Sequence, residues 1–421
     1  MNNNKAKLGR PPAHQTYLIM RSTTAFAFSL IITYELVYHT VEIGLTPLQL
    51  VAVGVVLEAM TFFFEIPTGI IADAYSRRLS VLIGLFLFGS GFLVEGLVAT
   101  FDAVLMAQVL WGIGFTFYSG AEAAWLTDEV GEERAGQLFL RATQIGQVAR
   151  LIGIGVGAWL VTYGLRIPIV VGSVLYILLA LFLTWAMSET GFQPSISDRG
   201  QGVLARMSQP FREGVTVVKA RPMLVRILLV GIVIGLCIGG FDRLDAAHFT
   251  ENFVFPRLGT LEPLAWFSVL AGVIALLSLI GAELARIQLT RHEHTSIAKL
   301  LFGLYSGMVL CLIVFVLSRW FIPAAICYCI SQSLRNVGRP LLIVWINQNA
   351  PSAVRATVIS MYWQSNALGQ IVGSPIVGWI GSVFSLRMAL MAATIVYTAV
   401  LPLLRIAAED AEVAKRGEET C

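Results

Sequence analysis

The sequence predicts an all-α membrane protein, with twelve transmembrane helices in two six-helix halves related by pseudo-twofold symmetry. Composition, the length of the apolar runs and an internal repeat lead to this prediction. Hydrophobic residues make up 57% of the 421 residues and charged residues 13%, with a mean hydropathy of +0.76. A soluble domain carries about 25% charged residues. The strands of an outer-membrane barrel alternate over only about ten residues. A soluble enzyme and a β-barrel are therefore both excluded.

Twelve apolar stretches are long enough to cross a bilayer, which takes about 20 residues. They cover residues 17–39, 47–71, 79–99, 102–126, 137–161, 167–187, 222–249, 262–288, 297–317, 321–347, 354–383 and 386–407. The longest polar interruption follows the sixth stretch. It predicts an N-terminal half (1–187), a cytoplasmic linker (188–221), a C-terminal half (222–407) and a charged cytoplasmic tail (408–421). Apolar residues near helical spacing predict an amphipathic linker helix on the membrane surface: Val203, Met207, Phe211, Val215 and Val218.

The two halves repeat each other at equivalent helices. Gly153 and Trp159 in the fifth stretch correspond to Gly373 and Trp379 in the eleventh. A parallel duplication of this kind places a binding site near the bilayer midplane, between the halves.

The distribution of Lys and Arg predicts the orientation. Most of the 29 basic residues lie in the termini, the linker and the turns on their side, whereas the opposite loops hold only Arg166, Arg257, Arg319 and Arg387. By the positive-inside rule, both termini are cytoplasmic in a multi-pass protein of the inner (plasma) membrane. The net charge of +3 gives no reason to expect a nucleic-acid partner.

The turn after the second stretch carries a recognisable motif. Residues 65–78 read Glu-Ile-Pro-Thr-Gly-Ile-Ile-Ala-Asp-Ala-Tyr-Ser-Arg-Arg. This resembles the signature loop of the major facilitator superfamily, Gly-x-x-x-Asp-[Arg/Lys]-x-Gly-x-[Arg/Lys]. Gly69, Asp73 and Arg78 match the pattern, Arg77 adds a second base beside Arg78, and Ala74 and Ser76 depart from the pattern. The resemblance implies a cytoplasmic gate in which Asp73 caps a facing helix and pairs with an arginine, and Gly69 permits close helix approach.

Other segments resemble bacterial exporters of this family and also depart from them. Gly369, Gly373 and Pro375 resemble a helix-five exporter pattern, but they lie in the eleventh stretch. Gln108, four residues before Gly112, stands where exporters often carry arginine. If this protein couples transport to protons, an arginine at this position does not take part in the coupling.

Acidic residues inside apolar stretches are candidates for proton coupling, because a charge at the bilayer centre costs about 2.5–3.5 kcal/mol even on insertion scales. The candidates are Asp242, Glu58, Glu35, Glu122 and Asp245. In the family, the first, fourth, seventh and tenth helices line the cavity. Asp242 is the first choice because it lies on the seventh, beside Arg243 and potentially opposite Arg339. Glu58, near midspan on the second, is the reserve.

Basic, aromatic and amide side chains in the spans are candidates for a substrate cavity. They are Arg335, Arg339, Arg150, Trp111, Tyr118, Gln364 and Asn366. Two arginines one helical turn apart need acidic partners or an anionic ligand. The alternative is structural: buried acid–base pairs that hold helices together, and aromatic residues that only fill the core.

The sequence contains no Walker A motif, no Ser/His/Asp set and no His-Glu-x-x-His, and Cys327-x-Cys329 has no second pair to complete a zinc site. We therefore expect no enzyme, no cofactor and no metal. The resemblance implies a monomeric secondary transporter that exports an organic, drug-like compound in exchange for protons by alternating access. The alternatives are uptake or facilitated diffusion of a sugar, metabolite or siderophore, and a transport-dead membrane receptor.

Overall fold

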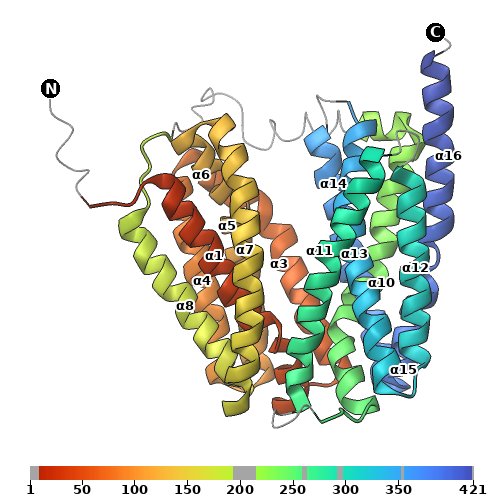
Figure 1. The fold of residues 1–421 in the computed structure, drawn as a ribbon, viewed down its shortest axis with the longest axis horizontal. Helices are drawn as coiled ribbons and strands as arrows, with labels where there is room; N and C mark the ends of the chain where they lie inside the picture. The colour runs from red at the N-terminus through yellow and green to blue at the C-terminus, as the bar shows by residue number, and fades with distance from the viewer. Residues whose placement is uncertain (1–8, 193–214, 258–262, 292–296, 352–354, 420–421) are drawn as a thin grey trace. The chain divides into compact units, whose positions relative to one another are not determined.

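A computed structural model of the chain describes residues 9–192, 215–257, 263–291, 297–351 and 355–419 (Figure 1). Throughout these residues the regular structure is helical, with no strand. Most of the predicted amphipathic linker helix, including Val203, Met207 and Phe211, lies outside the described residues.

Helices occupy every stretch that the sequence marks as apolar. Up to the linker they are α1 (Ala13–Ile32), α2 (Glu35–Val37), the π-helical turn η1 (Tyr38–Glu42), α3 (Pro47–Ala74), α4 (Arg77–Leu97), α5 (Phe101–Ser119), α6 (Ala121–Val130), α7 (Glu132–Leu160), the 3₁₀ turn η2 (Val161–Tyr163) and α8 (Arg166–Ala186). After the linker they are α10 (Pro222–Asn252), η3 (Pro263–Ala265), α11 (Trp266–Arg291), α12 (Ile297–Leu317), α13 (Phe321–Asn349), α14 (Arg355–Val383), α15 (Leu386–Tyr397) and α16 (Val400–Glu419).

Among the described residues, ten of these helical stretches are long and apolar enough to cross a membrane. The chain is therefore a multi-pass helical membrane protein. Helices α13 and α14 are each 29 residues long but are not among the ten. Both carry polar side chains well inside their length, such as Arg335 and Asn366. The count of twelve spans therefore stays a prediction.

The first span is interrupted, whereas the sequence predicts one continuous helix over 17–39. Helix α1 ends at Ile32, and the chain continues through α2 into the π-helical turn η1. There the Ile43 N–H donates to the Tyr38 carbonyl at 3.1 Å, a bond across five residues. Such π turns are rare and occur often at functional sites. Here the turn contains His39, which is completely buried.

The chain divides into two compact units. Unit 1 comprises Met1–Leu45, Val56–Ser197 and Arg257–Ser268, and unit 2 comprises Thr46–Val55, Asp198–Pro256 and Val269–Cys421. In Figure 1 most helices of unit 1 are coloured red to yellow and most of unit 2 green to blue. The first turns of α3 therefore belong to unit 2 and its remainder to unit 1.

Aromatic residues make up part of the interior of unit 1, where α1 packs against α7 and α8, and α4 packs against α5 and α8. The Phe88 ring lies 5.5 Å from that of Tyr176 and 5.9 Å from that of Tyr118, both in edge-on geometry. This is the favoured arrangement of aromatic pairs. These rings hold α4, α5 and α8 together along one side of a cavity described below.

Unit 2 is built around the close approach of α10 and α14. A Cβ atom at Gly235 of α10 would lie 2.1 Å from the Asn366 carbonyl oxygen, and one at Gly373 of α14 would lie 2.2 Å from the Leu236 carbonyl oxygen. Only glycine leaves room for two backbones at this distance. The exporter-like pattern in α14 thus forms a helix-packing surface.

Candidate functional site

The signature loop forms a network of charged residues at one end of unit 1. Arg77, at the start of α4, donates to Asp128 of α6 at 2.6 Å, and a second of its nitrogens lies 3.6 Å from Asp73. Arg78 donates its backbone N–H to Glu189 at 2.9 Å and its guanidinium to the Thr184 carbonyl. The loop therefore ties α4 to α6 and to the segment after α8.

Ser76 occupies the position at which the family pattern has glycine, and its backbone conformation shows why glycine is not needed there. Its φ is −173°, an extended conformation open to any residue, so no glycine is required. Its hydroxyl caps α4 by accepting the Leu79 N–H at 2.9 Å and donates to Glu189 at 2.7 Å. Serine is among the favoured N-cap residues.

The gate roles of Asp73 and Gly69 stay predictions. The Asp73 side chain is 61% exposed, and the closer acid to Arg77 is Asp128. A Cβ atom at Gly69 would meet no atom within 4 Å among the described residues, so the structure does not show the close helix approach expected there. The sequence pattern gave no sign of Asp128 or Glu189, because both come from segments distant from the loop.

A second polar cluster is buried in unit 1, beside the π-helical turn. Gln108 of α5 donates to Glu35 at 2.9 Å, and the Nε2 atom of His39 lies 2.7 Å from a carboxylate oxygen of Glu95 in α4. All four side chains belong to residues with no exposed surface. Gln108, which replaces the arginine of related exporters, thus contacts a proton-coupling candidate.

The chemistry of this cluster bears on metal binding. Ligand atoms of Glu35, His39 and Glu95 all lie within 4.8 Å of one another, a grouping that can hold a divalent cation. Direct hydrogen bonds already engage one oxygen of each carboxylate and one ring nitrogen. The arrangement therefore fits a hydrogen-bonded network better than a metal site.

Unit 1 also contains a cavity of about 300 Å³, at the lower end of the range for small-molecule pockets. Residues of α1, α4, α5, α7 and α8 line it, and three of them are predicted substrate-cavity residues: Trp111, Tyr118 and Arg150. The wall combines several aromatic rings with two arginines, the predicted Arg150 and the unpredicted Arg21.

The two arginines differ in their partners. Arg21 of α1 donates to Glu122 at 2.9 Å, and the other oxygen of Glu122 accepts the Tyr118 hydroxyl at 2.6 Å. No hydrogen bond or ion pair joins Arg150 to any residue in the described part of the chain. Glu122 is thus committed to an ion pair, whereas Arg150 contributes an unbalanced positive charge.

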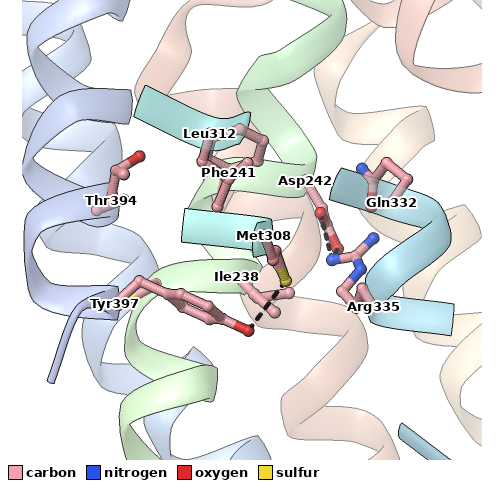
Figure 2. A pocket seen from close by; sticks show the side chains of 11 residues that line it. Ile238, Phe241, Asp242, Met308, Leu312, Gln332, Arg335, Thr394 and Tyr397 are labelled. Atoms are coloured by element: carbon pink, nitrogen blue, oxygen red, sulfur yellow. Dashed lines mark hydrogen bonds and ion pairs between the residues drawn. The ribbon is translucent and has the colours of Figure 1, made fainter. Parts of the chain in front are cut away.

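Unit 2 contains a smaller cavity, of about 10 Å³, beside an ion pair between two spans (Figure 2). Asp242 of α10 and Arg335 of α13 point toward each other, and one Arg335 nitrogen lies 2.7 Å from both carboxylate oxygens. The Asp242 side chain remains 35% exposed. The sequence places Asp242 beside Arg243 and potentially opposite Arg339, and the structure pairs it with Arg335, one turn before Arg339.

Asp245 lies three residues further along α10 and is buried. It accepts the Tyr328 hydroxyl at 2.7 Å and its own neighbour's N–H, that of Ala246, at 2.5 Å. Asp242 and Asp245 thus have different partners on α13, an arginine and a tyrosine. Tyr328 is a residue that the sequence did not single out.

The remaining candidates do not line either of these cavities. Asn366 is buried and donates to the Gly231 carbonyl at 3.1 Å, so it joins α14 to α10. Gln364 and Glu58 are half-buried on α14 and α3. Arg339 is also half-buried, and no ion pair involves it among the described residues.

Comparison with known proteins decides the family. The profile of the Major Facilitator Superfamily matches residues 16–373, most of the chain. This chain belongs to the major facilitator superfamily. Within it, the chain is 24% identical over 348 residues to the uncharacterized MFS-type transporter YxaM of Bacillus subtilis (strain 168), covering 80% of this chain and 82% of that one.

A second similarity is partial. Over 140 residues the chain is 26% identical to multidrug resistance protein MdtH of Salmonella paratyphi B, which is 32% of this chain and 35% of MdtH. The match thus spans about a third of that relative.

Solved structures of superfamily transporters share the fold. The chain aligns with the nucleoside transporter NupG with a TM-score of 0.72 at 13% identity, over 94% of this chain and 98% of NupG. It aligns with the peptide transporter POT in complex with sulfate with a TM-score of 0.74 at 15% identity, over 98% and 96%. At these identities the likeness shows the fold and not the substrate.

Proposed function

We propose that this superfamily member is a monomeric secondary transporter of the inner membrane, which exports an organic, drug-like compound in exchange for protons by alternating access. The observation that carries the proposal is the ion pair between Asp242 and Arg335. Both residues lie well inside long helices of unit 2, and intramembrane ionisable residues usually mark ion or substrate pathways.

The pair can work as a switch for a proton. While Arg335 holds Asp242, both carboxylate oxygens are engaged by one guanidinium. A change of state that separates α10 from α13 would free the carboxylate to take a proton, and re-forming the pair would displace it. Because the Asp242 side chain is partly exposed, a proton can reach its carboxylate. The exporter-like segments and the partial similarity to MdtH support export as the direction.

The test uses the full chain in proteoliposomes with a trapped pH-sensitive dye and an imposed pH gradient. Compounds from a panel of organic cations, anions and neutral molecules are added in turn. We expect at least one compound to cause proton movement with the wild-type chain. Asp242→Asn should abolish this movement but preserve counterflow exchange, which needs alternation and no net proton transfer.

The matched control is Asp102→Asn, which changes an exposed acid in the first turn of α5. It should behave as the wild type. Compound flux that does not depend on the pH gradient would favour facilitated diffusion. Coupled transport that survives Asp242→Asn and fails in Glu58→Gln would move the proton site to α3. Absence of any flux across the panel would favour a receptor.

A further inference from the structure

The cavity of unit 1 has an unequal balance of charge. Of the charged residues that line it, Arg21 is neutralised by Glu122, and Arg150 has no acidic partner in the described part of the chain. The cavity therefore carries one uncompensated positive charge.

Arg150 lies near the middle of the 32-residue span Glu132–Tyr163 and is exposed, where it lines the cavity. Ionisable residues at this depth usually face a water-filled cavity and mark a substrate pathway. Its side chain faces the cavity together with those of Thr143 and Gln147, which occupy the same face of α7. A polar stripe thus runs along this helix on the side that borders the cavity.

Aromatic side chains from other helices also line the cavity. Trp111 lies 6.0 Å from the ring of Phe28 and, with Phe115, lines the cavity from α5. Phe115 is 44% exposed, although it belongs to an interior wall. Flat apolar surfaces of this kind bind aromatic rings by offset or edge-on contacts. The cavity therefore combines polar and cationic groups with aromatic surfaces.

We propose that this cavity binds a monovalent aromatic organic anion, a carboxylate or a sulfonate, with its acidic group on Arg150 and its ring against Trp111 and Phe115. The inference rests on the proposed transport function and names the substrate class. A planar guanidinium matches the two oxygens of such a group in a bidentate contact. One free positive charge selects a single negative charge, and a cationic ligand would be repelled by Arg150.

The test measures equilibrium binding by titration calorimetry to the purified full chain in nanodiscs, near neutral pH and without a proton gradient. Three probes share one ring system and differ in charge: 2-naphthoate, 2-naphthamide and 2-naphthylmethylammonium. We expect naphthoate to bind about tenfold more tightly than the amide, the effect of one charge-assisted hydrogen bond. The ammonium should bind most weakly.

Variants at Arg150 and Trp111 separate the parts of the site. Arg150→Gln should reduce naphthoate affinity to that of the amide, and Arg150→Lys should keep part of the preference. Trp111→Leu should weaken both probes alike. The matched control is Arg141→Gln, an exposed arginine on the same helix that does not line the cavity, and it should bind as the wild type. If Arg150→Gln does not fold, Gln147→Glu places a carboxylate one turn from Arg150 and should remove the preference.

Each outcome is decisive. Equal affinities for the three probes, preference for the cation, no saturable binding of naphthoate, or a preference that persists in Arg150→Gln would overturn the inference. Because binding is measured without a gradient, the two proposals can fail separately. A chain that prefers naphthoate through Arg150 but shows no proton coupling refutes the proposed function alone. Coupled transport with no anion preference refutes this inference alone.

Discussion

At the scale of single residues, the ion pairs of Arg77 show that the motif identifies this arginine but not its main acidic partner. Within the loop its natural partner is Asp73, four residues earlier, but that carboxylate is mostly exposed and 3.6 Å away. Asp128 of α6 is 2.6 Å away and 24% exposed. Because solvent screens exposed pairs, they contribute little to stability, so the contact with Asp128 should be the stronger one.

We therefore expect Asp128→Asn to destabilise the protein by about 1–2 kcal/mol, as expected for a partly buried charge-assisted bond. Asp73→Asn should change stability by less than about 0.5 kcal/mol. Unfolding of the purified variants in detergent, followed by tryptophan fluorescence, measures both. A double-mutant cycle with Arg77→Gln should assign the larger coupling to Asp128. A coupling of Arg77 with Asp73 that equals or exceeds its coupling with Asp128 would contradict this prediction.

At the scale of elements, glycine determines how α10 and α14 meet. A Cβ atom at Gly373 would lie 2.2 Å from the Leu236 carbonyl oxygen. Any larger residue at this position must therefore push the two helices apart. The contact also involves Asn366, which donates to a carbonyl of α10. Small residues and interhelical hydrogen bonds are the usual sources of association between transmembrane helices.

Gly373→Ala should accordingly destabilise the protein by about 1–3 kcal/mol, the usual result of overpacking. The matched control is Gly303→Ala in α12, where a Cβ atom would meet nothing within 4 Å among the described residues. That change should be neutral or stabilising by up to about 1 kcal/mol, because alanine is the better helix former. Thermal unfolding of both variants in the same detergent provides the comparison. Similar melting temperatures for the two would show that α10 and α14 tolerate separation.

At the scale of the whole molecule, the sequence fixes a side for every turn once the positive-inside rule is applied. Glu133 lies in the first turn of α7, on the side predicted to be cytoplasmic, and Arg319 lies between α12 and α13, on the side predicted to be external. Both residues are exposed. These two positions are therefore predicted to lie on opposite sides of the membrane.

In a chain whose five native cysteines are replaced, Arg319→Cys should react with a membrane-impermeant maleimide in intact cells. Glu133→Cys should react only after the cells are opened. The physical reason is that basic loops are retained on the cytoplasmic side during insertion. Labelling of Glu133→Cys in intact cells, with Arg319→Cys protected, would reverse the topology and place the signature loop outside.

The sequence by itself determined the helical membrane class, the positions of the helices and the family. Composition and run length suffice for the class, since a backbone in lipid must satisfy its own hydrogen bonds and long apolar segments can do so only as helices. The signature loop supplied the family because its residues are contiguous. The interruption of the first span was not predictable in this way, because the apolar run continues through the residues where α1 ends and α2 begins.

Only the tertiary structure decided which charges are paired. Asp242 and Arg335 are 93 positions apart, and Glu122 and Arg21 are 101 apart. No local pattern connects residues at such separations, since helix packing sets their distance. Among the described residues, the same packing left Arg150 without an acidic partner and placed Asn366 between two helices instead of in a cavity. The sequence supplied the inventory of ionisable groups, and the structure showed which of them remain available to a ligand, because availability depends on what the neighbouring helices bring within a few ångströms.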